Sequence, residues 1–160
     1  MKTLVIYDSA YGNTEEVAKA VGKGLGEDAI IERVDNADWD NLGEYDLVVV
    51  GSPTQAGRPS PEIKAFLGRI PDGALKAVDV TGFDTRIDAR NQGFMLRTFM
   101  GFLGYAAGRI ARQLEAKGGH LITQPHGFFV NDKEGPLIEG ELDRATAWGS
   151  TIYHAKVAAQ

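Results

Sequence analysis

Short runs of Val, Ile and Leu alternate along the chain with longer segments in which apolar residues recur every three or four positions. Such short runs are typical of strands buried on both faces, and the longer segments are typical of amphipathic helices. The alternation therefore predicts an α/β fold, with a parallel sheet covered by helices on both faces. The predicted strands are 3–7 (TLVIY), 29–34 (AIIERV), 46–51 (DLVVVG), 77–83 (AVDVTGF) and 120–130 (HLITQPHGFFV).

Four further segments carry the helical spacing. The first is 14–25, and the second is 60–70, where Ser60 is a favoured N-cap and Pro61 occupies the first helical position. The remaining two are 91–117 and 139–158. An apolar stripe crosses the third segment, and we interpret it as core, with dimer packing or a cover over a ligand as alternatives. Its members are Phe94, Met95, Phe99, Met100, Phe102 and Tyr105.

Few arrangements satisfy five strands that are joined by right-handed crossovers with one helix each. We predict a single domain, residues 1–160, built on a doubly wound five-stranded parallel sheet of order 2-1-3-4-5. Pro125 is expected to interrupt or end the last strand, because proline is confined to sheet edges. Ligands of such sheets bind outside the carboxyl ends of the strands, where the strand order reverses. The loops after strands 1, 3 and 4 are therefore the expected site.

Composition and charge exclude several classes of function. The 160 residues include no cysteine, which excludes disulfides, thiolate metal sites and cysteine nucleophiles, and the three histidines lack the spacing of metal ligands. The net charge of −5 argues against nucleic-acid binding. No apolar stretch reaches the roughly 18 residues of a membrane span, and the first residues lack a basic leader. We expect a cytoplasmic protein that binds neither nucleic acid nor membrane, and that has no metal site.

The loop after the first strand, YDSAYGNTEE (7–16), is rich in hydrogen-bond donors and contains no Lys or Arg. A helix that starts near Thr14 directs its free N–H groups at residues 9–13, and its dipole favours an anion there. Together with Ser9 and Asn13, these groups can hold a phosphate monoester without a cationic side chain. Neither a Walker loop nor the dinucleotide fingerprint is present. The alternative is an unliganded turn with a threonine N-cap.

Two later loops are expected at the same edge of the sheet. GSPTQAGRPSP (51–61) is rich in Gly and Pro, and its backbone groups suit a planar heterocycle, although an ordinary connection fits nearly as well. FDTRIDARNQG (83–93) places Asp84 and Arg86 at the mouth, where a solvated surface pair is an equal alternative. The convergence of three such loops favours a ligand site.

The first loop resembles the phosphate loop of the flavodoxins, whose S/T-x-x-G-N-T pattern falls on Ser9, Gly12, Asn13 and Thr14. The resemblance covers essentially the whole chain, with the later loops matching by position, and the end of the chain is similar to short-chain flavodoxins. It implies FMN as the cofactor and an electron-transfer protein that cycles the flavin through quinone, semiquinone and hydroquinone states. The FMN-binding residues that it implies are Ser9, Ala10, Tyr11, Gly12, Asn13 and Thr14 at the phosphate, and Pro53, Thr54, Gln55, Ala56, Gly57, Phe83, Asp84, Thr85 and Arg86 at the ring.

The ring loops depart from the carriers of that family. No aromatic residue occupies 52–61, and Arg86 takes the position of a stacking aromatic. A guanidinium there can stack on a ring or donate in its plane, and its charge would raise the potential of the reduced flavin. With Arg58 and Arg90 it would also suit a negatively charged partner such as NAD(P)H. Gly57 is expected to let a peptide rearrange on reduction.

Three functions are compatible with these features. The first is an FMN electron carrier that serves a redox partner protein, as a monomer or homodimer and without a catalytic side chain of its own. The second is an FMN-dependent NAD(P)H oxidoreductase of the quinone reductase type. The third is a flavin-free signalling receiver of the same fold. A receiver needs an aspartate at the end of strand 3 and paired acids after strand 1, whereas this chain has Gly51-Ser52 and a lone Asp8, so the third is the weakest.

Overall fold

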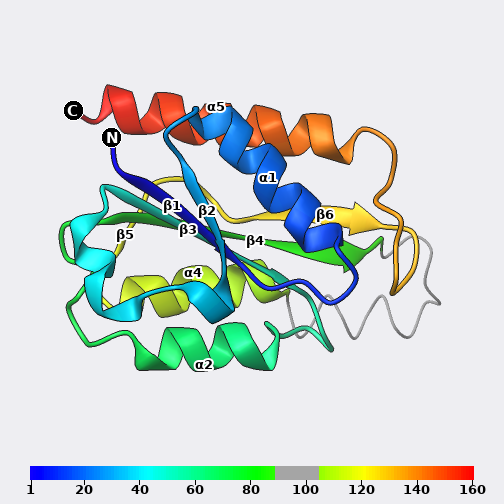
Figure 1. Ribbon diagram of the computed structural model, residues 1–160, viewed down its shortest axis with the longest axis horizontal. Helices are drawn as coiled ribbons and strands as arrows, with labels where there is room; N and C mark the ends of the chain where they lie inside the picture. Colours follow the sequence, from blue (N-terminus) through cyan, green and yellow to red (C-terminus); the bar gives the residue numbers. More distant parts are fainter. Residues whose placement is uncertain (89–104) are drawn as a thin grey trace.

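The computed structural model describes residues 1–88 and 105–160. All strand pairs of its central sheet are parallel, in the order β2-β1-β3-β4-β5, with β6 also beside β4 (Figure 1). The predicted α/β class, parallel sheet and strand order are confirmed. The strands are β1 (Thr3–Tyr7), β2 (Ile30–Arg33), β3 (Leu47–Pro53), β4 (Asp79–Ile87), β5 (His120–Leu121) and β6 (His126–Val130).

Two strands run further than the apolar pattern predicted. β3 continues to Pro53 and β4 to Ile87, so residues 83–86 belong to a strand and not to a loop, which corrects the prediction. The extension has a physical reason, since the end of β4 finds ladder partners on both sides, in β3 and in β6. Because successive side chains of a strand point to opposite faces, Phe83 enters the core on one face of the sheet.

The predicted fifth strand, 120–130, is divided into β5 and β6. The segment 122–125 between them contains Pro125, which has no N–H to donate to a ladder. The Thr81 hydroxyl donates to the Thr123 carbonyl at 3.0 Å and fastens this segment to β4. The predicted interruption is confirmed, and two short strands share the edge position of the sheet.

Within residues 1–88 and 105–160, four α-helices cover the sheet. Ser60 caps the second of them as predicted, since its Oγ accepts a hydrogen bond from the Ile63 N–H at 3.4 Å. Of the predicted helix 91–117, the structure shows 106–116 as helical, while residues 91–104, with the apolar stripe before Tyr105, lie outside the described residues. The helices are α1 (Asn13–Leu25), α2 (Pro61–Arg69), α4 (Ala106–Ala116) and α5 (Glu141–Ala158), and two 3₁₀ turns, Val34–Asn36 and Trp39–Glu44, connect β2 to β3.

The helices form two layers, with α1 and α5 on one face of the sheet and α2 and α4 on the other (Figure 1). Val17, Phe83 and Trp148 belong to the core under α1 and α5. Ile63 and Ile110 belong to the core under α2 and α4. Burial on both faces explains why β1 and the first part of β3 are almost entirely apolar.

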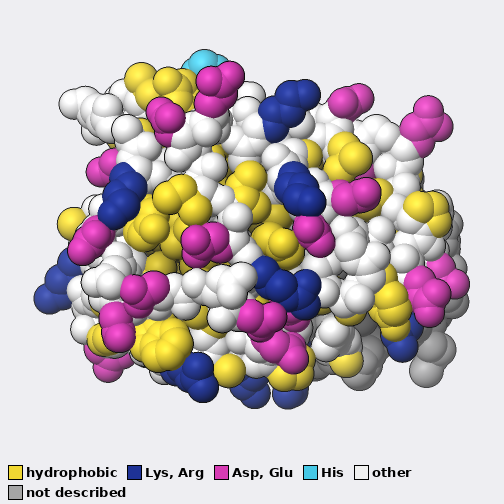
Figure 2. Space-filling model, in the orientation of Figure 1, with side chains coloured by type: hydrophobic (Ala, Val, Ile, Leu, Met, Phe, Trp, Pro, Cys, Tyr) yellow, Lys and Arg dark blue, Asp and Glu magenta, His cyan; other side chains and the backbone are white. Residues whose placement is uncertain are grey.

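Charged side chains of both signs are interspersed on the face that Figure 2 shows. Within residues 1–88 and 105–160, none of the helices is long and apolar enough to cross a membrane.

Candidate functional site

A cavity of about 600 Å³ opens beyond the carboxyl ends of β1, β3 and β4. We call it the edge cavity. Its volume lies within the usual range of small-molecule sites, which is roughly 300–1,000 Å³. The residues that line it are Ser9, Ala10, Tyr11, Asn13, Thr14, Pro53, Thr54, Gln55, Ala56, Thr85, Arg86, Ile87, Val130 and Lys133.

The loop from β1 to α1 forms one wall of the edge cavity. Gly12 is the N-cap of α1 with a φ of 93°, a left-handed conformation that glycine adopts without strain. The Gly12 N–H donates to the Ser9 Oγ at 3.0 Å, which tightens the loop. The Thr14 hydroxyl is not a cap, because it is buried against the Thr85 hydroxyl at 2.7 Å and ties α1 to β4.

Two cations that the sequence pattern did not reveal lie near this loop. Arg33, at the end of β2, donates to the Asp8 carboxylate at 3.2 Å and to the Ser9 carbonyl at 3.0 Å. Lys133, in the loop after β6, lines the edge cavity itself. Residues 9–14 themselves contain no positive side chain, and Lys133 brings one into the cavity from another loop.

The turn after β3 is a tight hairpin. Gln55 and Arg58 pair through two backbone hydrogen bonds of 2.8 and 3.1 Å, and the residues between them have positive φ, 50° at Ala56 and 77° at Gly57. Positive φ at both central positions is the pattern of a type I′ turn, and it is unusual for alanine. Arg109 Nε donates to the Gly57 carbonyl at 3.1 Å and holds the turn from the side of α4.

The end of β4 carries a buried ion pair. Arg86 donates to both oxygens of the Asp84 carboxylate, at 2.7 and 2.8 Å, and Asp84 is fully buried. The Asp84 carboxylate also accepts the Ala107 N–H at 2.8 Å, while the guanidinium of Arg86 lies 3.6 Å from the ring centre of Tyr105. Burial raises the pKa of Asp84, and the hydrogen bonds from Arg86 act against that rise. The pair is therefore not the solvated surface pair that the sequence allowed.

The sequence profile of the family described as Flavodoxin matches residues 5–148. The chain belongs to the flavodoxin family. Flavodoxins bind FMN, so the family match supports the cofactor that the sequence predicted.

Relatives of this flavodoxin-family chain carry two kinds of name. An NAD(P)H dehydrogenase (quinone) from Rhizobium rhizogenes is 27% identical and aligns over 99% of this chain and 98% of its own. A flavodoxin from Aquifex aeolicus is 38% identical, and that match spans only 41% of this chain and 37% of its own. The structure of an archaeal flavodoxin superposes with a TM-score of 0.72 over 98% of this chain and 99% of its own, at 19% identity, which shows the shared fold.

Most of the residues expected to bind FMN lie in the lining of the edge cavity, and four do not. Gly12 caps α1, and Gly57 lies in the hairpin beside the cavity. Asp84 lies behind Arg86. Phe83 points away from the cavity, where its ring meets Phe128 and Trp148 edge-on at 6.1 Å.

The structure adds Ile87, Val130 and Lys133 to the lining. The strand order could have predicted that these residues line the cavity, because the carboxyl ends of β4 and β6 lie side by side in a parallel sheet. The loop after β6 also reaches the first loop, where Asn13 Nδ2 donates to the Glu134 carbonyl at 3.1 Å. The amino-acid sequence of residues 131–136 did not predict that contact.

Proposed function

We propose that this chain is an FMN-binding electron-transfer protein whose FMN lies in the edge cavity. The observation that carries the proposal is the position of that cavity, at the carboxyl ends of β1, β3 and β4 and in front of the N-terminus of α1. That position is where a doubly wound sheet binds its ligand. FMN, when bound, supplies the acceptance and donation of electrons, while the protein supplies binding, orientation and electrostatics.

The phosphate of FMN is assigned to residues 9–14. The N-terminal turn of α1 has backbone N–H groups without helical partners, and the helix dipole favours an anion in front of them. The hydroxyl of Ser9 lies in the lining beside them. The positive charge of Lys133 comes from another loop of the same cavity and adds to the attraction for a phosphate.

The ring is assigned to the space between residues 53–56 and 85–87. The hairpin after β3 and the end of β4 form adjoining parts of the lining, and the Thr54 N–H donates to the Thr85 carbonyl at 2.8 Å where they meet. Arg86 enters the lining with its charge compensated by Asp84. We therefore expect a much smaller effect of Arg86 on the flavin potential than an isolated arginine would have.

A titration that compares FMN with riboflavin tests this assignment. Riboflavin lacks the phosphate, so we expect it to bind at least about tenfold more weakly than FMN, which corresponds to about 1.4 kcal/mol. Ser9→Ala should weaken FMN binding and leave riboflavin binding unchanged, and Ser150→Ala, on α5, is the matched control. Equal affinities for the two flavins would remove the phosphate assignment, and the absence of FMN binding would overturn the proposal.

A second candidate function is an FMN-dependent NAD(P)H oxidoreductase that reduces quinones. The full-length match to a quinone dehydrogenase favours it, and so does the absence of an aromatic side chain from residues 52–61, which leaves that wall open to a substrate. Anaerobic NADPH or NADH added to the FMN-loaded protein separates the two functions. Rapid bleaching of the flavin, with steady turnover when a quinone is added, supports the oxidoreductase. A flavin that stays oxidised supports the carrier.

The cytoplasmic location stays a prediction of the sequence.

A further inference from the structure

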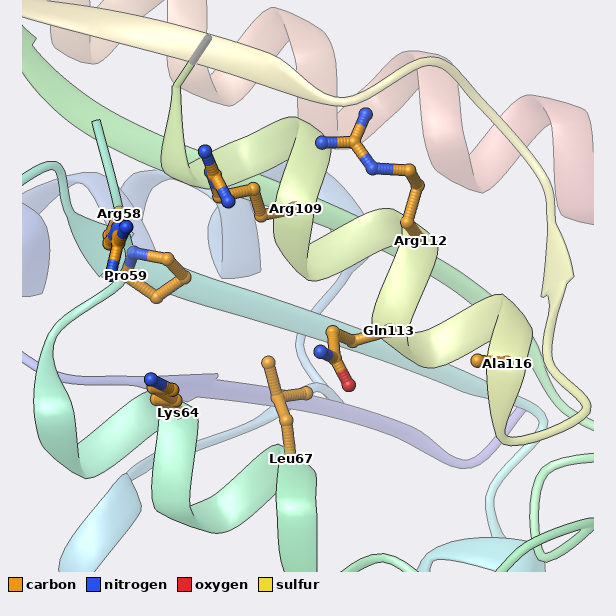
Figure 3. Close-up of a pocket in the computed structure, with 8 residues that line it drawn as sticks. All are labelled: Arg58, Pro59, Lys64, Leu67, Arg109, Arg112, Gln113 and Ala116. Carbon is orange, nitrogen blue, oxygen red and sulfur yellow. The ribbon is translucent and has the colours of Figure 1, made fainter. Parts of the chain in front are cut away.

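A second hollow, of about 320 Å³, lies between α2 and α4 (Figure 3). We call it the helix groove. Arg58 and Arg109 lie toward its end near the hairpin, and Ala116 lies at the other end. Leu67 of α2 and Gln113 of α4 face each other across its middle. The residues that line it are Arg58, Pro59, Lys64, Leu67, Arg109, Arg112, Gln113 and Ala116.

The lining of the helix groove is half cationic and contains no acid. Arg58, Lys64 and Arg112 are exposed, and none of them makes an ion pair or a side-chain hydrogen bond with any residue in 1–88 or 105–160. Such a concentration of unpaired positive charge is notable in a chain whose net charge is −5. Like charges that converge on a concave surface repel each other, and an anion in the hollow removes that repulsion.

We propose that the helix groove binds the phosphate groups of a small phosphorylated ligand. The guanidinium fork matches the geometry of phosphate oxygens, and the lysine adds a point charge. Pro59 and the buried Leu67 are the apolar part of the lining that the rest of the ligand would meet. A concave hollow of this volume suits a small molecule, whereas a protein partner requires a far larger surface of roughly 800 Å².

The helix groove adjoins the edge cavity without sharing lining residues with it. The same hairpin separates them, since Gln55 and Ala56 line the cavity while Arg58 and Pro59 line the groove. Arg109 lines the groove and holds the hairpin through the Gly57 carbonyl. The inference is independent of the proposed function, because it uses none of the residues assigned to FMN.

Calorimetric titration of the FMN-saturated protein with pyrophosphate tests the inference, because FMN then blocks the phosphate loop. Ionic strength is kept constant with NaCl. We expect saturable binding that is weakened about fivefold to tenfold by Lys64→Gln and by Arg112→Gln. Lys23→Gln, on the exposed side of α1, changes the net charge equally and should have no effect.

The source of the phosphate is identified by comparing three probes. Tighter binding of adenosine 2′,5′-bisphosphate than of pyrophosphate indicates a nucleotide, and the reverse order, or a preference for inorganic phosphate, indicates an inorganic or short phosphorylated ligand. An acidic peptide is titrated as a control. The proposal is overturned if no phosphate probe saturates, if Lys23→Gln weakens binding as much as Lys64→Gln, or if the peptide binds and the phosphate probes do not. Should FMN itself fail to bind, Lys64→Gln must still weaken pyrophosphate binding where Ser9→Ala does not, so the two proposals fail separately.

Discussion

The two helix layers of this protein are held in different ways. On one face, α1 and α5 approach so closely that their backbones touch through Gly24 and Gly149. On the other face, α2 and α4 leave the helix groove between them. Both layers cover the same sheet with apolar residues, so the sheet alone does not decide how closely its helices pack.

Side-chain size at the helix contact explains the difference. A Cβ atom on Gly24 would meet the Thr146 carbonyl and the Ser150 N–H, so only glycine permits that approach. Lys64 and Arg112 place long cationic side chains in the lining between α2 and α4, so these helices do not meet through small residues as α1 and α5 do. The open layer is anchored instead at the first turn of α4, where the buried Asp84 accepts the Ala107 N–H. Close backbone packing thus joins α1 to α5 on one face, whereas on the other face a buried hydrogen bond to Asp84 holds the start of α4.

Loss of the polar anchor should have the largest effect. Asp84→Ala leaves the Arg86 guanidinium without its partner and the Ala107 N–H without an acceptor. We expect the free energy of unfolding to fall by about 3–5 kcal/mol, as for other buried pairs broken on one side. Urea denaturation measures it, with Asp84→Asn as a milder control of the same shape. A loss below about 1 kcal/mol would show that α4 is held by apolar packing alone.

Gly24→Ala tests the closed layer. The added methyl group has no space between α1 and the backbone of α5, so we expect the two helices to move apart. Overpacking of this kind typically costs about 1–3 kcal/mol, and the backbone atoms in the way place this variant near the upper end. The urea midpoint should fall with little change in its slope. An unchanged midpoint would mean that the α1–α5 contact is adjustable.

Gly68→Ala is the same substitution in the open layer, and its effect should have the opposite sign. Gly68 lies on the exposed side of α2, and an added Cβ meets no atom within 4 Å. Alanine has a higher helix propensity and restricts the unfolded chain, so we expect a gain of about 0.5–1 kcal/mol. Thermal and urea unfolding of the two variants side by side give the comparison directly. Destabilisation by Gly68→Ala would contradict the open space beside α2.

The smallest effect is expected from an ion pair between α5 and the sheet. Burial acts to raise the pKa of Asp79, but hydrogen bonds from Lys156 and His120 hold it below its ordinary value of 3.8. A lowered native pKa means that the carboxylate stabilises the fold above about pH 4, and that this stability is lost as the pH falls through the native pKa. Asp79→Asn should therefore cost about 0.5 kcal/mol at pH 7, and the difference from wild type should narrow below pH 4. A pH-independent difference would show that the charge is not involved.

The central strands of the sheet could be predicted from the sequence because they are buried on both faces. Runs such as LVVV at 47–50 contain no polar residue, which is typical of a buried strand, and Pro125 predicted the interruption of the edge strand. The strand ends were less accessible, since Ser52 and Asp84 look like loop residues. Both are buried, and their polar groups have partners inside the fold: the Ser52 hydroxyl accepts the Ser60 N–H, and the Asp84 carboxylate accepts hydrogen bonds from Arg86 and from the Ala107 N–H.

The part of the candidate site that depends on local backbone geometry could be predicted from the sequence. The loop 9–14 is one turn between one strand and one helix, so its place and its role at the start of α1 could be predicted from its sequence. Arg33 reaches that loop from the end of β2, and Lys133 lines the same cavity from the loop after β6. Arg58 and Arg112, which line the helix groove, lie 54 positions apart in the sequence. Nothing in local spacing brings such residues together, because only the packing of separate elements decides it.

The interrupted edge of the sheet bears on self-association. A sheet is extended by a second chain only where an edge offers a continuous row of unpaired backbone groups. Here one edge, β2, has four residues, and the other consists of two and five residues separated by a segment with a proline. Neither edge is a long flat template, so the chain has a built-in protection against edge-to-edge aggregation.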